Sequence, residues 1–245
     1  MKNILVACEE SQTVTKAFKD VWGGHEFNIF SCDLQEESGG HPEWHIQANV
    51  LPLLNGDCTF TTRDGTIHTI NGKWDLLICH PVCTHLAVSG APHFEKKRKD
   101  GRQREGIEFF CQFLNVNCDH VAIENPVNII SGDYIPKWFP DLAEKYNLPI
   151  SPSQYIHPWM FGDNVCKKTG LWLKGLPNLI PDVKEQPYIE KKEWVNNKGQ
   201  HKAQDLWWWE TFKIKDPLER SKARSKTFRG IAYAMATQWG KYVGL

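Results

Sequence analysis

The sequence has no long hydrophobic run and no secretion signal. Its longest apolar runs, such as Ile4–Cys8 and Leu76–Cys79, are far shorter than the roughly 18–20 apolar residues that cross a bilayer. The N-terminus lacks the apolar region and the small-residue cleavage site of a signal peptide. We therefore expect a cytoplasmic protein with no membrane span.

An excess of charge and a dense set of cysteines are also absent. Lysine and arginine number 29, as do aspartate and glutamate, so the formal net charge is zero. A globally basic nucleic-acid coat and an acidic disordered tail are therefore excluded, and any polyanion must meet local basic patches. Eight cysteines in 245 residues, with no Cys-x-x-Cys pair, do not make a disulfide scaffold. Reduced thiols are expected, most of them small buried hydrophobes.

Short apolar runs alternate with amphipathic stretches, which is typical of α/β proteins. Buried strands are predicted over four apolar runs, 3–8, 26–32, 74–79 and 121–124, and short strands over 154–156 and 171–174. Helices are predicted over 12–22, 107–116, 135–146 and 221–243. Strand, helix and strand with short links indicate right-handed parallel units. We expect one α/β domain over 1–245, with a mainly parallel sheet flanked by helices, a hairpin insertion at 58–70 and an irregular insertion at 176–219.

Reactive or polar side chains follow four of the predicted strands. They are the runs Cys8-Glu9-Glu10-Ser11, Asp33, His80-Pro81-Val82-Cys83 and Glu124-Asn125-Pro126. In an open parallel sheet, ligands bind beyond the carboxyl ends of the strands, so these residues are the first candidates for a site. An acid after the second strand, here Asp33, is a usual partner of a ribose hydroxyl in adenosine-containing cofactors. A solvated turn residue would show the same pattern.

A Pro-x-Cys loop after one strand and Glu-Asn after the next resemble the DNA (cytosine-5)-methyltransferases. The chain is more similar still to the short phage and prophage proteins labelled DNA cytosine methyltransferase. The matching stretches are 5–18 with 31–33, 74–85, 123–126, 158–177 and 219–240. The resemblance implies a Rossmann-like class I methyltransferase fold in a bacterial or phage-infected cell. It also implies methyl transfer from S-adenosylmethionine to carbon 5 of a cytosine flipped out of DNA.

The resemblance gives catalytic roles to Cys83, Glu124 and Asn125. Carbon 5 of cytosine is a poor nucleophile until a thiolate adds to carbon 6, so Cys83 would be the nucleophile. Glu124 would hydrogen-bond ring nitrogen 3 and the exocyclic amine, and Asn125 would hold the loop geometry. His80 and His85 are placed to favour the thiolate. Taken singly, Cys83 is equally explained as a buried structural thiol and Glu124 as a surface acid.

The resemblance places the S-adenosylmethionine donor at the first strands. Its expected ligands are Cys8, Glu9, Glu10, Ser11, Asp33, Asn49, His80 and Pro81. The loop after the first strand contains no glycine, whereas the family has a glycine-rich turn there. Ala48-Asn49 also stands where the family has Gly-Asp. Loss of the donor site therefore remains an alternative.

Two basic stretches, 95–105 and 213–229, suit phosphate contacts. The predicted nucleic-acid ligands are Lys96, Lys97, Arg98, Lys167, Lys168 and Arg224. Here Lys167 or Lys168 would replace the family's Gln-x-Arg-x-Arg, and Trp207–Trp209 would stack on bases unless they pack in the core. The region 176–219 is much shorter than a target-recognition domain. Sequence specificity is therefore expected to be short or relaxed, or supplied by a partner protein.

Other readings remain open. One alternative is an amino-group methyltransferase, a class that has Asp-Pro-Pro-Tyr in the loop where this chain has His80-Pro81-Val82-Cys83. That class needs an acceptor for the amino group and an aromatic residue that stacks on the base. Here His80 and Cys83 stand in those two places, so this alternative is disfavoured. A module that binds nucleic acid or a protein partner would explain the missing glycines, and a nucleotide-modifying enzyme would use another donor. A zinc site from Cys79, His80, Cys83 and His85 conflicts with the alternation of side chains along a strand. We expect no metal.

Overall fold

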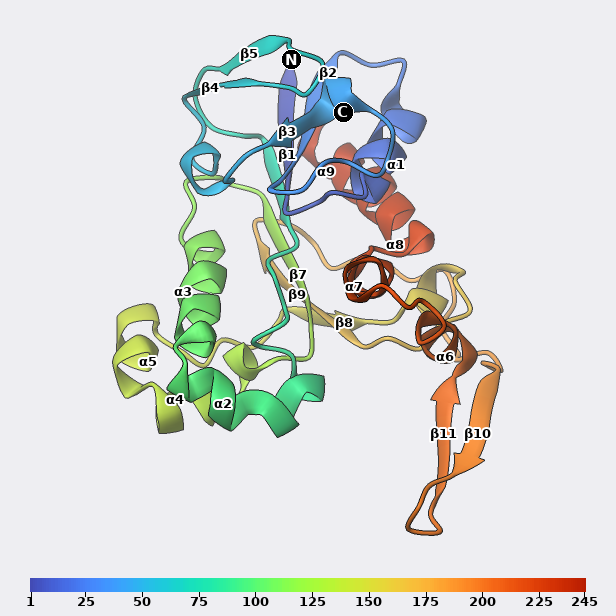
Figure 1. Ribbon diagram of the computed structural model, residues 1–245. Helices are drawn as coiled ribbons and strands as arrows, with labels where there is room; N and C mark the ends of the chain where they lie inside the picture. Colours follow the sequence, from blue (N-terminus) through green and yellow to red (C-terminus); the bar gives the residue numbers. More distant parts are fainter.

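A seven-stranded, mainly parallel sheet forms the body of the computed structural model, which describes residues 1–245 (Figure 1). Its strand order is β3-β2-β1-β6-β7-β9-β8. The strands are β1 Lys2–Ala7, β2 Phe27–Asp33, β3 His45–Gln47, β6 Leu76–Cys79, β7 Val121–Pro126, β8 Gln154–Ile156 and β9 Thr169–Lys174. Strand β9 pairs antiparallel with both β7 and β8, and all other pairings in the sheet are parallel. The predicted α/β class and mainly parallel sheet are confirmed.

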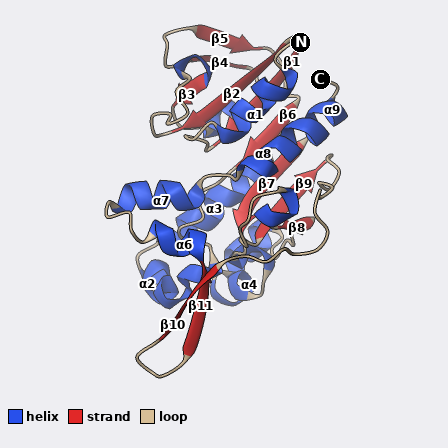
Figure 2. Cartoon of the chain, turned by 90° about the vertical axis from the view of Figure 1, so that its right-hand side faces the viewer, coloured by secondary structure: helices blue, strands red, loops and turns tan.

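The central strands are apolar throughout because both faces of the sheet are covered. Successive residues point to opposite faces, so Leu5 and Leu77 belong to one buried cluster and Ile4 and Leu76 to the other. The first cluster includes the apolar face of α3, which spans Arg102–Leu114. The second includes α1 (Thr13–Trp22) and α8 (Arg229–Ala234), which lie together on one face of the sheet in Figure 2. Packing on both faces of the sheet therefore holds the ends of the strands in place.

Two predicted helices are interrupted in the structure. The remaining helices are α2 Phe94–Lys99, α4 Tyr134–Trp138, α5 Pro140–Tyr146, α6 Leu206–Thr211, α7 Pro217–Ser225 and α9 Gly240–Val243. The segment 135–146 divides at Phe139, because the residue before a proline is disfavoured in helical conformation. The segment 221–243 divides between α7 and α8. Within α8, Gly230 lies against the carbonyl of Phe161, where a Cβ atom would come within 1.9 Å of the oxygen.

Two hairpins lie outside the main sheet. The pair β4 (Cys58–Thr61) and β5 (Ile67–Ile70) corresponds to the hairpin predicted at 58–70. The pair β10 (Lys191–Val195) and β11 (His201–Asp205) falls within 176–219, where we predicted irregular structure. It projects from the body in both views (Figures 1 and 2). The sequence gives little sign of these strands because most of their side chains are exposed on both faces, so no apolar alternation marks them. No helix has the length and apolar character needed to span a membrane.

Candidate active site

His80 and Glu124 meet at the carboxyl edge of the sheet. The strands β6 and β7 pair in parallel, with Cys79 opposite Ile123, so the residue that follows each of these positions lies at the same edge. His80 Nδ1 is 2.9 Å from Glu124 Oε2, and each side chain is 11% exposed. The predicted strand-end residues are therefore brought into direct contact.

The contact between His80 and Glu124 is a buried pairing of a positive imidazole ring with a negative carboxylate. Burial lowers the pKa of His80, but the hydrogen bond and charge of Glu124, together with the charge of Glu9, outweigh it and raise that pKa. Burial raises the pKa of Glu124, but His80 and Lys167 outweigh it and lower that pKa. The two groups therefore form an imidazolium–carboxylate pair. His80 Nε2 is buried and has no hydrogen-bond partner.

Asn125 ties the loop that carries Cys83 to the end of β7. Its Nδ2 donates to the carbonyl of Pro81 at 2.6 Å, and its Oδ1 accepts from Asn128 Nδ2 at 2.9 Å. The backbone of His80 donates to the carbonyl of Ala7, and the carbonyl of Cys83 accepts from two following N–H groups. These contacts fix the Cys83 backbone beside the end of β7.

Lys167 lies in the segment before β9, and its charge acts on the same group of residues. Burial raises the pKa of the Cys83 thiol, and the charge of Glu124 adds to this effect, whereas Lys167 and Lys97 oppose it. Lys167 Nζ donates to the carbonyl of Arg224 at 3.0 Å. Its charge acts on Cys83, His80 and Glu124. We call this group the strand-end cluster: His80, Cys83, Glu124, Asn125 and Lys167.

The loop after β1 adopts left-handed backbone without any glycine. Cys8 has φ 60° and Gln12 has φ 54°, conformations that cost a non-glycine residue about 1–2 kcal/mol each. Between them, the carboxylate of Glu9 accepts from Val14 N at 2.5 Å and Thr15 Oγ1 at 2.7 Å. Glu9 thus satisfies the free N–H groups at the start of α1 rather than facing outward.

Two other predicted donor ligands also turn toward the protein backbone. Ser11 Oγ accepts from the N–H of Thr13 and lies 3.0 Å from its hydroxyl. Asn49 Oδ1 accepts from Leu51 N at 3.1 Å, in the turn after β3. The side chains of Ser11 and Asn49 therefore shape loops around the first strands.

Asp33 and Glu10 keep carboxylate groups without a cationic partner. Asp33 Oδ1 accepts from Gln35 N at 2.8 Å, and neither acid takes part in an ion pair. Burial raises the pKa of Asp33, and the nearby charge of Glu10 contributes in the same direction. Glu10 Oε2 is buried and has no hydrogen-bond partner. These two carboxylates are available to accept hydrogen bonds from hydroxyl or ammonium donors of a ligand.

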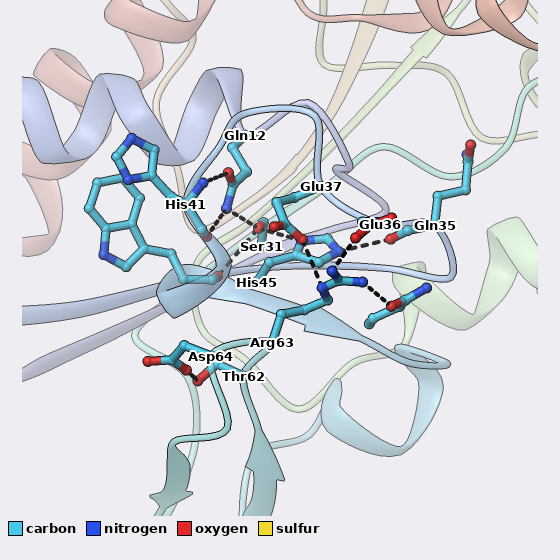
Figure 3. Close-up of polar contacts among 12 residues, drawn as sticks. Gln12, Ser31, Gln35, Glu36, Glu37, His41, His45, Thr62, Arg63 and Asp64 are labelled. Carbon is cyan, nitrogen blue, oxygen red and sulfur yellow. Dashed lines mark hydrogen bonds and ion pairs between the residues drawn. The ribbon is translucent and has the colours of Figure 1, made fainter.

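A buried polar network that contains Gln12, Ser31 and His45 was not predicted (Figure 3). Gln12 is fully buried and donates to Ser31 Oγ at 3.2 Å and to the carbonyl of His41 at 2.8 Å. Ser31 Oγ lies 2.9 Å from His45 Nδ1, and His45 Nε2 lies 2.9 Å from the carbonyl of Gln35. The network fixes the loop that follows Asp33. Its only sequence signal is the presence of polar residues within or beside apolar runs.

Most of the predicted nucleic-acid ligands pack against the protein's own groups. Lys97 Nζ donates to the carbonyl of Thr84 at 2.6 Å, and Lys168 lies over the Tyr155 ring. The guanidinium of Arg98 lies 3.9 Å from the centre of the Trp138 ring. Arg224 is placed likewise, 3.9 Å from the Trp208 ring and 4.5 Å from the Phe212 ring. Lys96 is exposed.

The zinc alternative finds no support in the arrangement of its four residues. Cys79 is fully buried in β6, whereas His80 contacts Glu124. No group of three or more His, Cys, Asp and Glu side chains is placed to hold a metal ion.

No protein-family model matches the chain, and no curated protein is found as a relative. The function must therefore be argued from the site.

Proposed function

We propose that the protein transfers a methyl group from S-adenosylmethionine to carbon 5 of cytosine in DNA. The observation that carries this proposal is the buried contact between His80 and Glu124, beside which the hydrogen bond from Asn125 to the Pro81 carbonyl holds the loop that carries Cys83. Covalent activation of a pyrimidine needs a thiol nucleophile and a group that stabilises charge on the ring. The mainly parallel sheet is compatible with the class I methyltransferase fold that the sequence resemblance implies.

Asp33 and Glu10 are the residues that would hold the donor. Asp33 would accept from the ribose hydroxyls, and Glu10 would accept from the ammonium group of the methionine part. Glu9, Ser11 and Asn49 would act indirectly, since their side chains support the surrounding loops. When bound, the donor supplies an electrophilic methyl group.

On the acceptor side, the chain's own residues activate the cytosine ring. Cys83 gives its proton to water, a loss favoured by the positive charge of Lys167, and the thiolate adds to carbon 6. Glu124 accepts from the exocyclic amine, and the proton held by the His80–Glu124 pair is delivered to ring nitrogen 3. After carbon 5 is methylated, it loses its proton to water. The ring then returns the nitrogen 3 proton to the pair and expels the Cys83 thiolate.

The test is transfer of labelled methyl groups from S-adenosylmethionine to duplex DNA, with mass spectrometry of the nucleosides. We expect 5-methylcytosine from the natural protein and at least a thousandfold loss, roughly, in Cys83→Ala, because the adduct cannot form. Cys58→Ser removes a half-buried thiol from β4 and should keep full activity. Methyl label on the exocyclic amine would favour the amino-group alternative. Failure of the folded protein to bind S-adenosylmethionine would favour a binding module or another donor.

A further inference from the structure

Lys97 is a charged residue that the fold buries. It lies in α2, the helix that follows the Cys83 loop, and it is 8% exposed. Lys96 and Lys99 of the same helix are exposed. A lysine is rarely buried unless its charge is paired, yet no ion pair of the protein includes Lys97. The positive charge of Lys97 therefore has no carboxylate partner in the folded chain.

Three contacts hold the Lys97 ammonium against the loop that carries Cys83. Its Nζ donates to the carbonyl of Thr84, the residue after Cys83, at 2.6 Å. The same Nζ lies 5.9 Å from the centre of the Phe94 ring. At Gly90, a Cβ atom would lie only 3.3 Å from this Nζ, so the absence of a side chain there leaves room for the ammonium. Lys97 is therefore fixed to the backbone next to the thiol.

The thiol of Cys83 lies where positive charge is needed. Burial raises the pKa of Cys83, and the charge of Glu124 adds to this effect. Lys167 and, to a smaller extent, Lys97 oppose it. These two lysines come from different segments, each donates to a backbone carbonyl, and neither takes part in an ion pair. Two cations without carboxylate partners thus favour the same thiolate.

The other charged groups near Lys97 do not replace this pairing. Burial and the charge of Arg102 lower the pKa of Lys97, whereas Cys83 and Asp100 raise it. Asp100 already forms an ion pair with Arg102. Burial, Lys97 and Arg102 lower the pKa of His85, so this imidazole is neutral near neutral pH and adds no positive charge. Lys97, rather than His85, therefore supplies positive charge to the thiolate from this side.

We propose that Lys97 is a positioning residue for the nucleophile: it holds the Cys83 loop through the Thr84 carbonyl and directs a positive charge toward the thiolate. A buried ammonium that is bound to a backbone carbonyl is not presented to phosphates, so this role replaces the phosphate contact predicted from the sequence. The inference rests on the proposed function in taking Cys83 as the nucleophile. It goes further by naming a residue that prepares the thiolate before any DNA binds.

The test is alkylation of Cys83 by iodoacetamide over a series of pH values, without DNA or donor, followed by mass spectrometry of the peptides. Only the thiolate reacts, so the midpoint of the rate against pH reports the ionisation of each cysteine. In Lys97→Met the midpoint for Cys83 should rise by roughly half a pH unit or more, because a nearby cation favours the charged form. The rise should be smaller than in Lys167→Met, whose charge has the larger effect.

Matched variants and other cysteines separate charge from packing. Lys99→Met removes an exposed lysine from the same helix and should leave the midpoint unchanged, whereas Lys97→Arg keeps the charge and should restore most of the shift. The midpoint for the exposed Cys166 should be the same in every variant. The fully buried Cys79 should stay unmodified while the protein is folded. If Lys97→Met exposes Cys79, Lys97→Gln takes its place, since the amide can still donate to the Thr84 carbonyl.

Two results would overturn the role of Lys97. They are an unchanged midpoint for Cys83 in Lys97→Met, which would show that Lys97 only packs the loop, and an equal rise in Lys99→Met. These results are distinct from failure of the proposed function. If the midpoint rises but no methyl group is transferred, the activity is wrong and the effect of Lys97 on the thiolate stands. If methyl groups are transferred and the midpoint does not depend on Lys97, only this inference is wrong.

Discussion

The two halves of the sheet's carboxyl edge use similar residues in different ways. At the ends of β6 and β7, polar side chains contact each other, as His80 and Glu124 do. At the ends of β1 and β3, Glu9 and Asn49 bind nearby backbone N–H groups instead. The difference follows from what comes next in the chain. Helix α1 begins four residues after Glu9 and offers free N–H groups, whereas Glu124 is followed by Asn-Pro and no helix that it could cap. An acidic residue at a strand end is therefore a candidate site residue chiefly when no following helix offers free N–H groups that its carboxylate would bind.

Glu124→Gln should have the largest effect among substitutions that test this contrast. The amide cannot share the His80 proton, so the charge on the cytosine adduct is no longer relieved. We expect methyl transfer to fall roughly a hundredfold or more, with donor binding unchanged. Single-turnover transfer and calorimetry with S-adenosylhomocysteine measure the two effects. A variant with full activity would show that the buried pair is structural.

Asp33→Asn tests the donor half of the edge. Loss of the carboxylate should weaken S-adenosylmethionine binding about tenfold or more, the usual effect of losing a hydrogen bond to a charged group. Asn49→Ala is the matched comparison, because its side chain is already bonded to Leu51 N and should change donor affinity little. Equal losses in the two variants, measured by calorimetry, would contradict the assignment of Asp33 as the free ligand.

Lys167→Met should change the pH dependence of transfer. The positive charge of Lys167 lowers the pKa of Cys83 against the effect of burial, so its removal raises that pKa. Because the thiolate is the reactive form, the rate should rise at higher pH in the variant than in the natural protein. Lys167→Arg should restore the profile, and Lys168→Met should leave it in place, since Lys168 lies over Tyr155. Identical pH profiles for Lys167→Met and the natural protein would show that Lys167 does not influence Cys83.

Glu9→Ala should have the smallest effect on chemistry. It leaves the N–H groups of Val14 and Thr15 without their acceptor, which costs about 1–2 kcal/mol of folding free energy. Thermal unfolding should therefore begin at lower temperature. Transfer per folded molecule should fall less than in the other variants, because Glu124 contributes more than Glu9 to raising the pKa of His80. A large loss of donor affinity in the folded variant would instead make Glu9 a direct ligand.

The sequence predicted the parts of the fold that bury apolar side chains. The strands β1, β2, β6 and β7 were found from their apolar runs because both sides of the sheet are covered. The hairpin of β10 and β11 was missed because its strands bury few side chains. The break between α7, which ends at Ser225, and α8, which begins at Arg229, also escaped prediction.

The candidate site was predictable in its residue types and only partly in its contacts. Parallel pairing placed the ends of β6 and β7 together, so the meeting of His80 and Glu124 follows from strand order. The inward turn of Glu9 and the network around Gln12 depend on backbone positions that no residue spacing specifies. Side-chain direction at a strand end is thus decided by its neighbours in space.

The most direct test of the central claim is covalent trapping of Cys83. A duplex that contains 5-fluorocytosine, incubated with the protein and S-adenosylmethionine, cannot lose the carbon 5 substituent, so the cysteine adduct should persist. We predict a denaturation-resistant protein–DNA complex whose cross-linked peptide contains Cys83 and which is absent for Cys83→Ala. No complex from protein that binds both ligands, or a cross-link at the exposed Cys166, would contradict the account.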